Sequence, residues 1–195
     1  MSNKDDVREN IVELARVIFS KFGYKKTTMD DIANAAGKGK SSLYYYFKSK
    51  EEVFEAVVEN EASILSAELN KVLDKDINPK EKLREYILVR LKVIETLSNI
   101  MEVIKNKYLT EIECVYGIRK KYDQDELRML RLILEEGVEK GVFEIENEEL
   151  AAEGILTFMK GLQIPLFIDN YLSKTEPRLD NILSMLFFGI LSKKG

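Results

Sequence analysis

The chain has 195 residues, of which 45% are apolar and 33% charged, and this balance predicts a globular protein with a substantial core. It has no histidine and one cysteine, Cys114, which excludes Cys/His zinc sites, histidine-based catalytic triads and an intrachain disulfide. No apolar run is long enough to span a membrane, and the N-terminus has no signal-peptide pattern. We therefore expect a cytoplasmic protein with no membrane partner.

The net charge of −4 is unevenly distributed along the chain. Residues 1–50 carry ten basic and six acidic side chains, whereas residues 51–195 carry twenty and twenty-eight. A basic end on an acidic body favours contact with a polyanion, but an excess this small also arises by chance. Because no nucleophile–base pair or phosphate loop is visible, we expect no enzyme activity, no cofactor and no metal.

Helical periodicity dominates the first fifty residues. Apolar residues at a three-to-four spacing predict a helix over about 5–22. Thr28 and Asp31 form a capping-box pair that opens a short second helix, and Gly37 closes it. A third helix is predicted over about 40–46. One longer helix followed by two short helices joined through a glycine turn is the helix-turn-helix arrangement.

The remaining chain is also predicted to be helical, because it shows no alternating strand pattern. A helix over about 49–74 is expected to link an N-terminal domain, residues 1–50, with a C-terminal domain, residues 51–195. Further helices are expected from Pro79 onward and over about 98–108, 110–140 with a break near 117–123, 148–170 and 178–193. The predicted fold class is all-α.

The third predicted helix has the properties of a recognition helix. A helix that enters the major groove, about 12 Å wide, needs a slim and polar exposed start. Lys40, Ser41 and Ser42 supply polar side chains there. Leu43 and Phe47, four residues apart, are expected to pack inward and brace the helix.

Three consecutive tyrosines follow, at Tyr44, Tyr45 and Tyr46. Three consecutive residues span about 200° of a helix, so these rings cannot all face the core. We expect at least one of the hydroxyls to reach a phosphate or a base. The lysines at Lys48 and Lys50 flank the helix end and could contact phosphates or remain ordinary solvated charges.

These residues resemble the N-terminal signature of the TetR family of transcriptional regulators over about residues 8–55. The matching positions are Ala15, Phe19, Phe22, Gly23, Tyr24, the run from Thr27 to Ala33, Ala36, Gly37 and the run from Ser42 to Glu52. The resemblance implies a homodimer, a two-fold symmetric DNA operator, and a C-terminal pocket for an unidentified small-molecule effector. It further implies a repressor that a small hydrophobic effector releases from DNA.

The same resemblance implies two sets of DNA contacts. The base-facing set is Lys40, Ser41, Ser42, Tyr44 and Tyr45. The phosphate-facing set is Thr28, Tyr46 and Lys50, with Thr27, Lys48 and Lys38 as further candidates. Lys38 and Gly39 depart from the family pattern, and Gly39 removes a capping side chain just where the recognition helix begins.

The C-terminal half offers candidates for the effector pocket and the dimer seam. Arg90 falls on an apolar helix stripe, where it pairs with a glutamate, extends its charged end to the surface, or contacts an anionic effector. Each remaining pocket candidate, taken alone, is more typical of plain core than of a ligand wall: Tyr86, Met101, Ile104, Tyr108, Tyr116, Phe158 and Met159. The dimer seam is expected to use Gly154, Phe158, Gly161, Ile182, Leu183, Leu186 and Phe187.

A second hypothesis is a DNA-bound scaffold for other proteins that senses no small molecule. A filled C-terminal core would favour the scaffold, whereas an enclosed cavity of several hundred Å³ would favour an effector.

Overall fold

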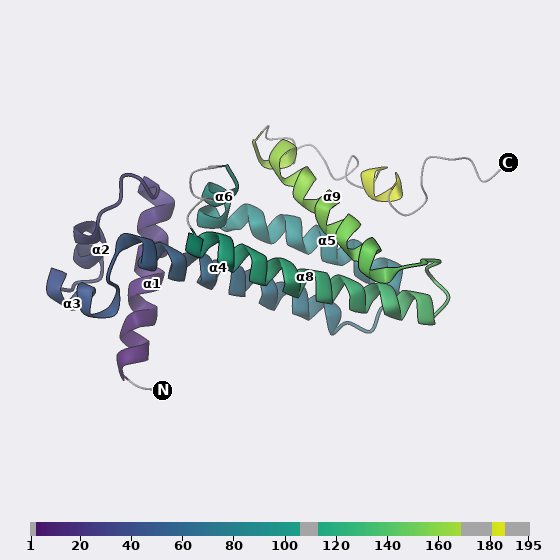
Figure 1. Cartoon of the computed structure of the whole chain (residues 1–195), viewed down its shortest axis with the longest axis horizontal. Coiled ribbons are helices and arrows are strands. Elements are labelled where there is room, and N and C mark those ends of the chain that lie inside the picture. The colour runs from purple at the N-terminus through teal and green to yellow at the C-terminus, as the bar shows by residue number, and fades with distance from the viewer. Residues whose placement is uncertain (1–2, 106–112, 169–180, 186–195) are drawn as a thin grey trace.

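The computed structural model describes residues 3–105, 113–168 and 181–185, and all regular elements in these ranges are helices, which confirms the all-α class. The helices are α1 (Asn3–Phe22), α2 (Met29–Ala35), α3 (Lys40–Tyr46), α4 (Lys50–Leu73), α5 (Pro79–Thr96), α6 (Ser98–Lys105), α8 (Glu113–Glu139) and α9 (Glu148–Ile168). Helices α1–α3 gather at one end of the molecule, and α4 runs from them into a body that it forms with α5, α8 and α9 (Figure 1). None of the described helices is long and apolar enough to cross a membrane.

Local caps and glycines fix the turns of the N-terminal unit. Thr28 Oγ1 accepts from the Asp31 amide at 3.2 Å, and Asp31 Oδ2 accepts from the Thr28 amide at 2.9 Å. This reciprocal pair is the predicted capping box of α2. Gly23 and Gly37 have φ angles of 76° and 61°, in the left-handed region that glycine adopts without strain. They lie just after α1 and α2, where the sequence predicted the helices to end.

A small aromatic core holds α1, α2 and α3 against the start of α4. The ring centroid of Phe54 lies 5.1 Å from that of Phe19 and 4.8 Å from that of Tyr24. Leu43 and Phe47 are both buried in the same cluster, which confirms that they brace α3 from behind. Helix α3 is therefore presented on a packed support.

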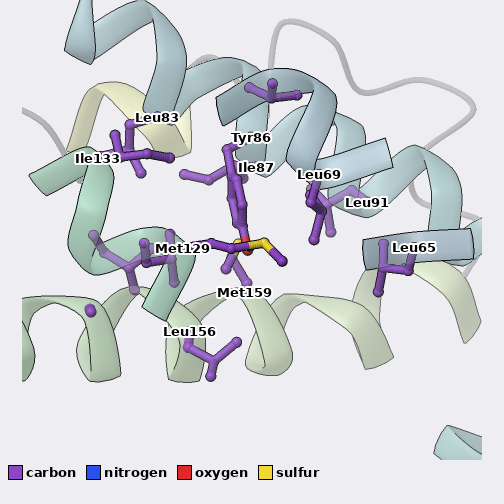
Figure 2. Close-up of a cluster of buried hydrophobic side chains, with 14 of the residues drawn as sticks. Leu65, Leu69, Leu83, Tyr86, Ile87, Leu91, Met129, Ile133, Leu156 and Met159 are labelled. Carbon is purple, nitrogen blue, oxygen red and sulfur yellow. The ribbon is translucent and has the colours of Figure 1, made fainter. Parts of the chain in front are cut away.

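A second, larger core fills the body, where α4, α5, α8 and α9 pack together. Tyr86 of α5 is fully buried at its centre, and Figure 2 shows its hydroxyl end pointing toward Met129 and Met159. The Tyr86 hydroxyl donates to Met129 Sδ at 3.9 Å, a weak acceptor. Burial, assisted by the nearby Glu126 carboxylate, raises the pKa of Tyr86 well above its usual value. This tyrosine is a neutral core residue.

Helix α8 is more continuous than the sequence predicted. Helix α8 runs without a break through 117–123, because Ile118 is buried and Tyr122 packs on the smaller core. Packing in that stretch outweighs the low helix propensity of Gly117. Helix α9 runs through Pro165 to Ile168, close to the helix predicted over about 148–170. Proline removes only one helical donor, which a helix survives near its end.

Candidate DNA-binding surface and effector pocket

The start of α3 is an exposed polar surface of the N-terminal unit. Lys40, Ser41 and Ser42 are all exposed, and no side chain caps the helix at Gly39. The amides of Ser42 and Leu43 both donate to the Gly39 carbonyl, so α3 begins at Lys40 despite the missing cap. Three short or flexible polar side chains therefore stand at the tip of the helix.

The three tyrosines of α3 point in different directions, as their helical spacing predicts. Tyr45 is 67% exposed and Tyr44 is 43% exposed, while Tyr46 is half-buried. The rings of Tyr45 and Tyr46 meet edge to face with centroids 5.1 Å apart. Such a contact restrains the Tyr45 ring at the surface and leaves its hydroxyl in solvent.

The lysines around α3 differ in how firmly the protein holds them. Lys40 Nζ donates to Asp30 Oδ2 at 3.0 Å, and this bond raises the pKa of Lys40. Lys50 Nζ donates to the Tyr24 carbonyl at 2.9 Å and lies 4.3 Å from the centroid of the Tyr24 ring. By contrast, Lys38 and Lys48 are exposed. Any new acceptor must compete with Asp30 for Lys40, whereas the Tyr24 carbonyl already holds Lys50.

The two threonines before α2 have mainly local partners. Thr27 is only 1% exposed, and its hydroxyl donates to the Gly23 carbonyl at 2.8 Å. Thr28 is exposed, but its hydroxyl is within 2.6 Å of Asp31 Oδ2. The Thr28 hydroxyl and amide together lower the pKa of Asp31. Thr27 thus lies below the surface, and Thr28 lies on it.

A pocket lies between α4, α5, α6 and α8, with one residue from α9. Its cavity is about 70 Å³ and its walls are mostly apolar. The described residues that line it are Val58, Ala62, Leu65, Arg90, Ile94, Ile100, Val103, Ile104, Ile118, Arg119, Tyr122, Asp123, Glu126 and Lys160. That volume admits a few water molecules but is well below the roughly 300–1,000 Å³ of a typical ligand site.

Arg90 pairs with an internal carboxylate, as one of its predicted alternatives describes. Arg90 Nε and Nη2 both donate to the carboxylate of Glu126 on α8, the second at 3.2 Å. Both side chains are almost completely buried at the pocket wall. A forked, buried pair of this kind has little freedom to reorient.

The other predicted pocket residues divide into wall, core and undescribed positions. Ile104 lines the pocket together with Arg90. Tyr86, Met101 and Met159 are instead buried in the larger core, with Phe158 packed against it. Tyr108 lies outside the described residues, and the Tyr116 side chain does as well.

The sequence reasoning missed the charged residues at the pocket. Lys160 of α9 pairs with Asp123 of α8 at 2.6 Å, and Arg119 lies one helical turn earlier on α8. The sequence offers little indication of them, because charged residues at such helical positions usually face solvent. Only the packing of α9 on α8 brings Lys160 to the pocket.

Helix α6 touches both the pocket and the N-terminal unit. Ile100, Val103 and Ile104 line the pocket, while Glu102 accepts a hydrogen bond from the Tyr24 amide at 3.1 Å. Tyr24 in turn donates its hydroxyl to Glu51 at 2.7 Å, which lowers the pKa of that carboxyl. One helix therefore connects the pocket wall with the residue that fixes Lys50.

A buried carboxylate reinforces this connection. Glu61 of α4 is 1% exposed, and it accepts from the Ile100 amide at 2.9 Å and the Asn99 amide at 3.1 Å. The Asn99 side-chain amide donates to Glu61 at 2.7 Å and to the Arg16 carbonyl of α1 at 3.2 Å. Glu61 thus caps the start of α6 from a neighbouring helix.

The predicted dimer seam is partly described. Gly154 and Gly161 of α9 are exposed, and an added Cβ at either would have nothing within 4 Å. The same open face carries Leu150, which is 63% exposed. Leu183 is instead buried in the larger core of its own chain, and Ile182 is half-buried beside it. Leu186 and Phe187 lie outside the described residues.

Comparisons with known proteins agree with this geometry. Residues 11–57 match the family described as bacterial regulatory proteins, tetR family. The chain is 30% identical to the HTH-type transcriptional repressor KstR2 of Mycolicibacterium smegmatis, over 70% of this chain and 67% of that protein. It is 26% identical to the uncharacterized HTH-type transcriptional regulator YhgD of Bacillus subtilis, over 90% and 88%. The fold is similar to the Bacillus subtilis transcriptional regulator FadR in complex with stearoyl-CoA, with a TM-score of 0.74 at 20% identity over 94% and 99%.

Proposed function

The chain belongs to the TetR family of bacterial regulatory proteins, and from this premise we propose that it is a dimeric repressor that an effector releases from DNA. It is a transcriptional regulator by family. The observation that carries the proposal is the braced, polar tip of α3, where Lys40, Ser41 and Ser42 stand exposed over a fully buried Leu43. A rigid polar helix start of this kind suits direct readout in the major groove.

The proposed contacts on DNA follow from exposure and from the existing bonds. Ser41, Ser42, Tyr44 and Tyr45 would face base edges, together with Lys40 once it leaves Asp30. The phosphate set is Thr28, Lys38, Tyr46, Lys48 and Lys50. The buried hydroxyl of Thr27 supports a structural role for that residue. Because Lys50 is held by the Tyr24 carbonyl, it would reach a phosphate from a fixed position.

A second copy of the chain is proposed to pack on α8 and α9. The open face of α9, with Gly154, Gly161 and Leu150, supports close approach of another helix. Leu132 on α8 is 50% exposed and adds apolar area to the same two helices. In such a dimer the two α3 helices would enter successive major grooves about 34–36 Å apart.

The effector is proposed to be largely apolar, because eight aliphatic side chains line the pocket. Any ligand larger than a few waters must enlarge the cavity of about 70 Å³. Long-chain acyl-CoA thioesters are the first compounds to test, since the similarly folded FadR was solved with stearoyl-CoA. Arg119 and Lys160 would receive the acidic part of such a ligand at the pocket.

Enlargement of the pocket would be transmitted through α6. Moving Ile100, Val103 and Ile104 outward would also move Glu102, which bonds to the Tyr24 amide. Because the Tyr24 carbonyl holds Lys50, a shift of Tyr24 would also move Lys50 and the proposed phosphate-binding surface. The effector needs only a higher affinity for the displaced conformer than for the DNA-binding one.

In vitro selection from a random-sequence duplex pool tests the proposed function. The wild-type chain should recover a two-fold symmetric sequence. Lys50→Ala should weaken binding to all sequences alike and lower the salt dependence, whereas Ser42→Ala should change base preference. Lys71→Ala, on the solvent side of α4 far from α3, is the matched control. Recovery of no sequence above background would reject the proposal.

The small cavity keeps the scaffold hypothesis as a second candidate. A DNA-bound scaffold has no need of a pocket that opens. The two candidates differ in ligand-induced stabilisation, because a ligand that binds the folded chain raises its melting temperature by mass action. A rise with stearoyl-CoA that Arg119→Gln reduces supports an effector. An unchanged melting temperature across a panel of acyl thioesters and other apolar acids supports the scaffold.

A further inference from the structure

The first two turns of α1 place two cations directly against the recognition helix. Lys4 Nζ lies 4.8 Å from the centroid of the Tyr45 ring, and Arg8 Cζ lies 4.8 Å from the centroid of the Phe47 ring. Both side chains belong to exposed residues. The two positions are four residues apart, so they lie one above the other on the face of α1 that continues into the buried Ile11 and Ala15.

The aromatic partners link these cations to the proposed DNA surface. Tyr45 is the most exposed of the three tyrosines and is proposed to face bases, and Phe47 directly precedes the exposed Lys48. A cation over a ring face keeps its charge and retains N–H groups for other acceptors. Lys4 and Arg8 therefore extend the basic surface sideways from α3, beyond the helix-turn-helix itself.

The neighbouring charges set the limits of this surface. Asp5, Asp6 and Glu9 lie on the same turns of α1, one or two positions from Lys4 or Arg8. At about 100° per residue, these acids point away from the face of α1 that meets α3. They also complement the positive end of the α1 dipole. The acids thus prevent a broad basic patch and leave two discrete cations beside Tyr45 and Phe47.

We propose that Lys4 and Arg8 bind phosphates of the DNA strand that flanks the groove occupied by α3. The proposal rests on the proposed function and adds a second phosphate-binding edge to it. Tyr45 would then be held from two sides, by Tyr46 within α3 and by Lys4 of α1. Phosphate contacts on either side of a recognition helix fix its depth and tilt in the groove.

The salt dependence of DNA binding tests the proposal. The double variant Lys4→Gln/Arg8→Gln removes both charges and keeps an unbranched, polar side chain at each position. Each lost phosphate contact lowers the slope of log K against log salt by about 0.9, so a dimer losing four contacts should lose about 3 to 4. The probes are the duplex selected with the wild-type chain and a mixed-sequence duplex of equal length, and both should show the loss.

Two controls separate phosphate binding from packing. Lys21→Gln is the matched control for Lys4, because Lys21 Nζ also lies over a ring, 5.2 Å from the centroid of Phe22, but at the other end of α1. DNA binding by this variant should show the wild-type salt slope. Lys4→Arg/Arg8→Lys keeps both charges and should retain the slope. If the double Gln variant keeps the wild-type slope of log K against log salt at an unchanged melting temperature, this proposal alone is overturned. Loss of slope in the charge-conserving variant overturns it too. Failure of the wild type to bind any duplex overturns the proposed function as well.

Discussion

Replacing Glu61 by alanine should destabilise the chain through the start of α6. In the wild type the buried Glu61 carboxylate accepts from the Asn99 and Ile100 main-chain amides at 3.1 and 2.9 Å. The variant leaves both amides without this acceptor in a buried site. Each buried donor that loses its partner costs about 1–3 kcal/mol, so the two together cost about 2–6 kcal/mol. Water entering the vacated volume recovers part of this, and we expect a loss of about 3 kcal/mol.

Urea denaturation at fixed protein concentration measures this loss, since a dimer's stability depends on concentration. Glu59→Ala is the matched control on the same helix. The Glu59 carboxylate pairs with Lys121 at 3.2 Å on the surface, where such pairs contribute little. The control should therefore match the wild type. If Glu61→Ala is as stable as Glu59→Ala, the carboxylate does not cap α6 and the connection from α4 to α1 through Asn99 is wrong.

Three further predictions follow from particular contacts. Gly137→Ala should destabilise the chain by about 1–3 kcal/mol in thermal denaturation, because an added Cβ would lie 1.9 Å from the Phe143 ring. The control Gly117→Ala lies on the same helix, and its added Cβ meets nothing within 4 Å. It should be neutral or stabilising in the same assay. Hydrogen bonds from Lys140 and Lys82 lower the pKa of Glu136 from its usual 4.5. The stability that Glu136 contributes is therefore complete above that pH and is lost as the pH falls through the folded-state pKa. The free energy of unfolding of Glu136→Gln should differ from that of the wild type at pH 7, and the two values should converge in acid. Glu102→Ala should weaken the effect of effector on DNA affinity in fluorescence anisotropy while Glu95→Ala, exposed on α5, leaves it intact; equal effects of the two variants would argue against transmission through α6.

Local features of the N-terminal unit could be predicted from the sequence because they depend on near neighbours. The capping box of Thr28 and Asp31, the glycine turn and the spacing that puts Leu43 and Phe47 on one face all involve residues within four positions. Helical spacing alone also separated the directions of the three tyrosines. Such short-range rules can be applied without knowing how distant helices pack.

The pocket could be predicted only in part, since its contacts depend on how distant helices pack. Arg90 was recognised as a cation on an apolar stripe. Its partner Glu126 is 36 residues away, however, and which glutamate pairs with Arg90 depends on where α8 packs. Glu61 lies four residues from both Val57 and Leu65 and could have been recognised by the same signal. The Asp123–Lys160 pair gave no such signal, because both residues look like ordinary surface charges.

Hydroxyl-radical footprinting of the wild-type chain on its selected duplex tests the central claim most directly. A dimer that reads DNA with α3 should protect two symmetric half-sites on one face of the duplex. Their centres should be one helical turn, about 34–36 Å, apart. Adding an effector that raises the melting temperature of the chain should remove both protected regions together. A single asymmetric protected region, or uniform protection along the duplex, would contradict the account.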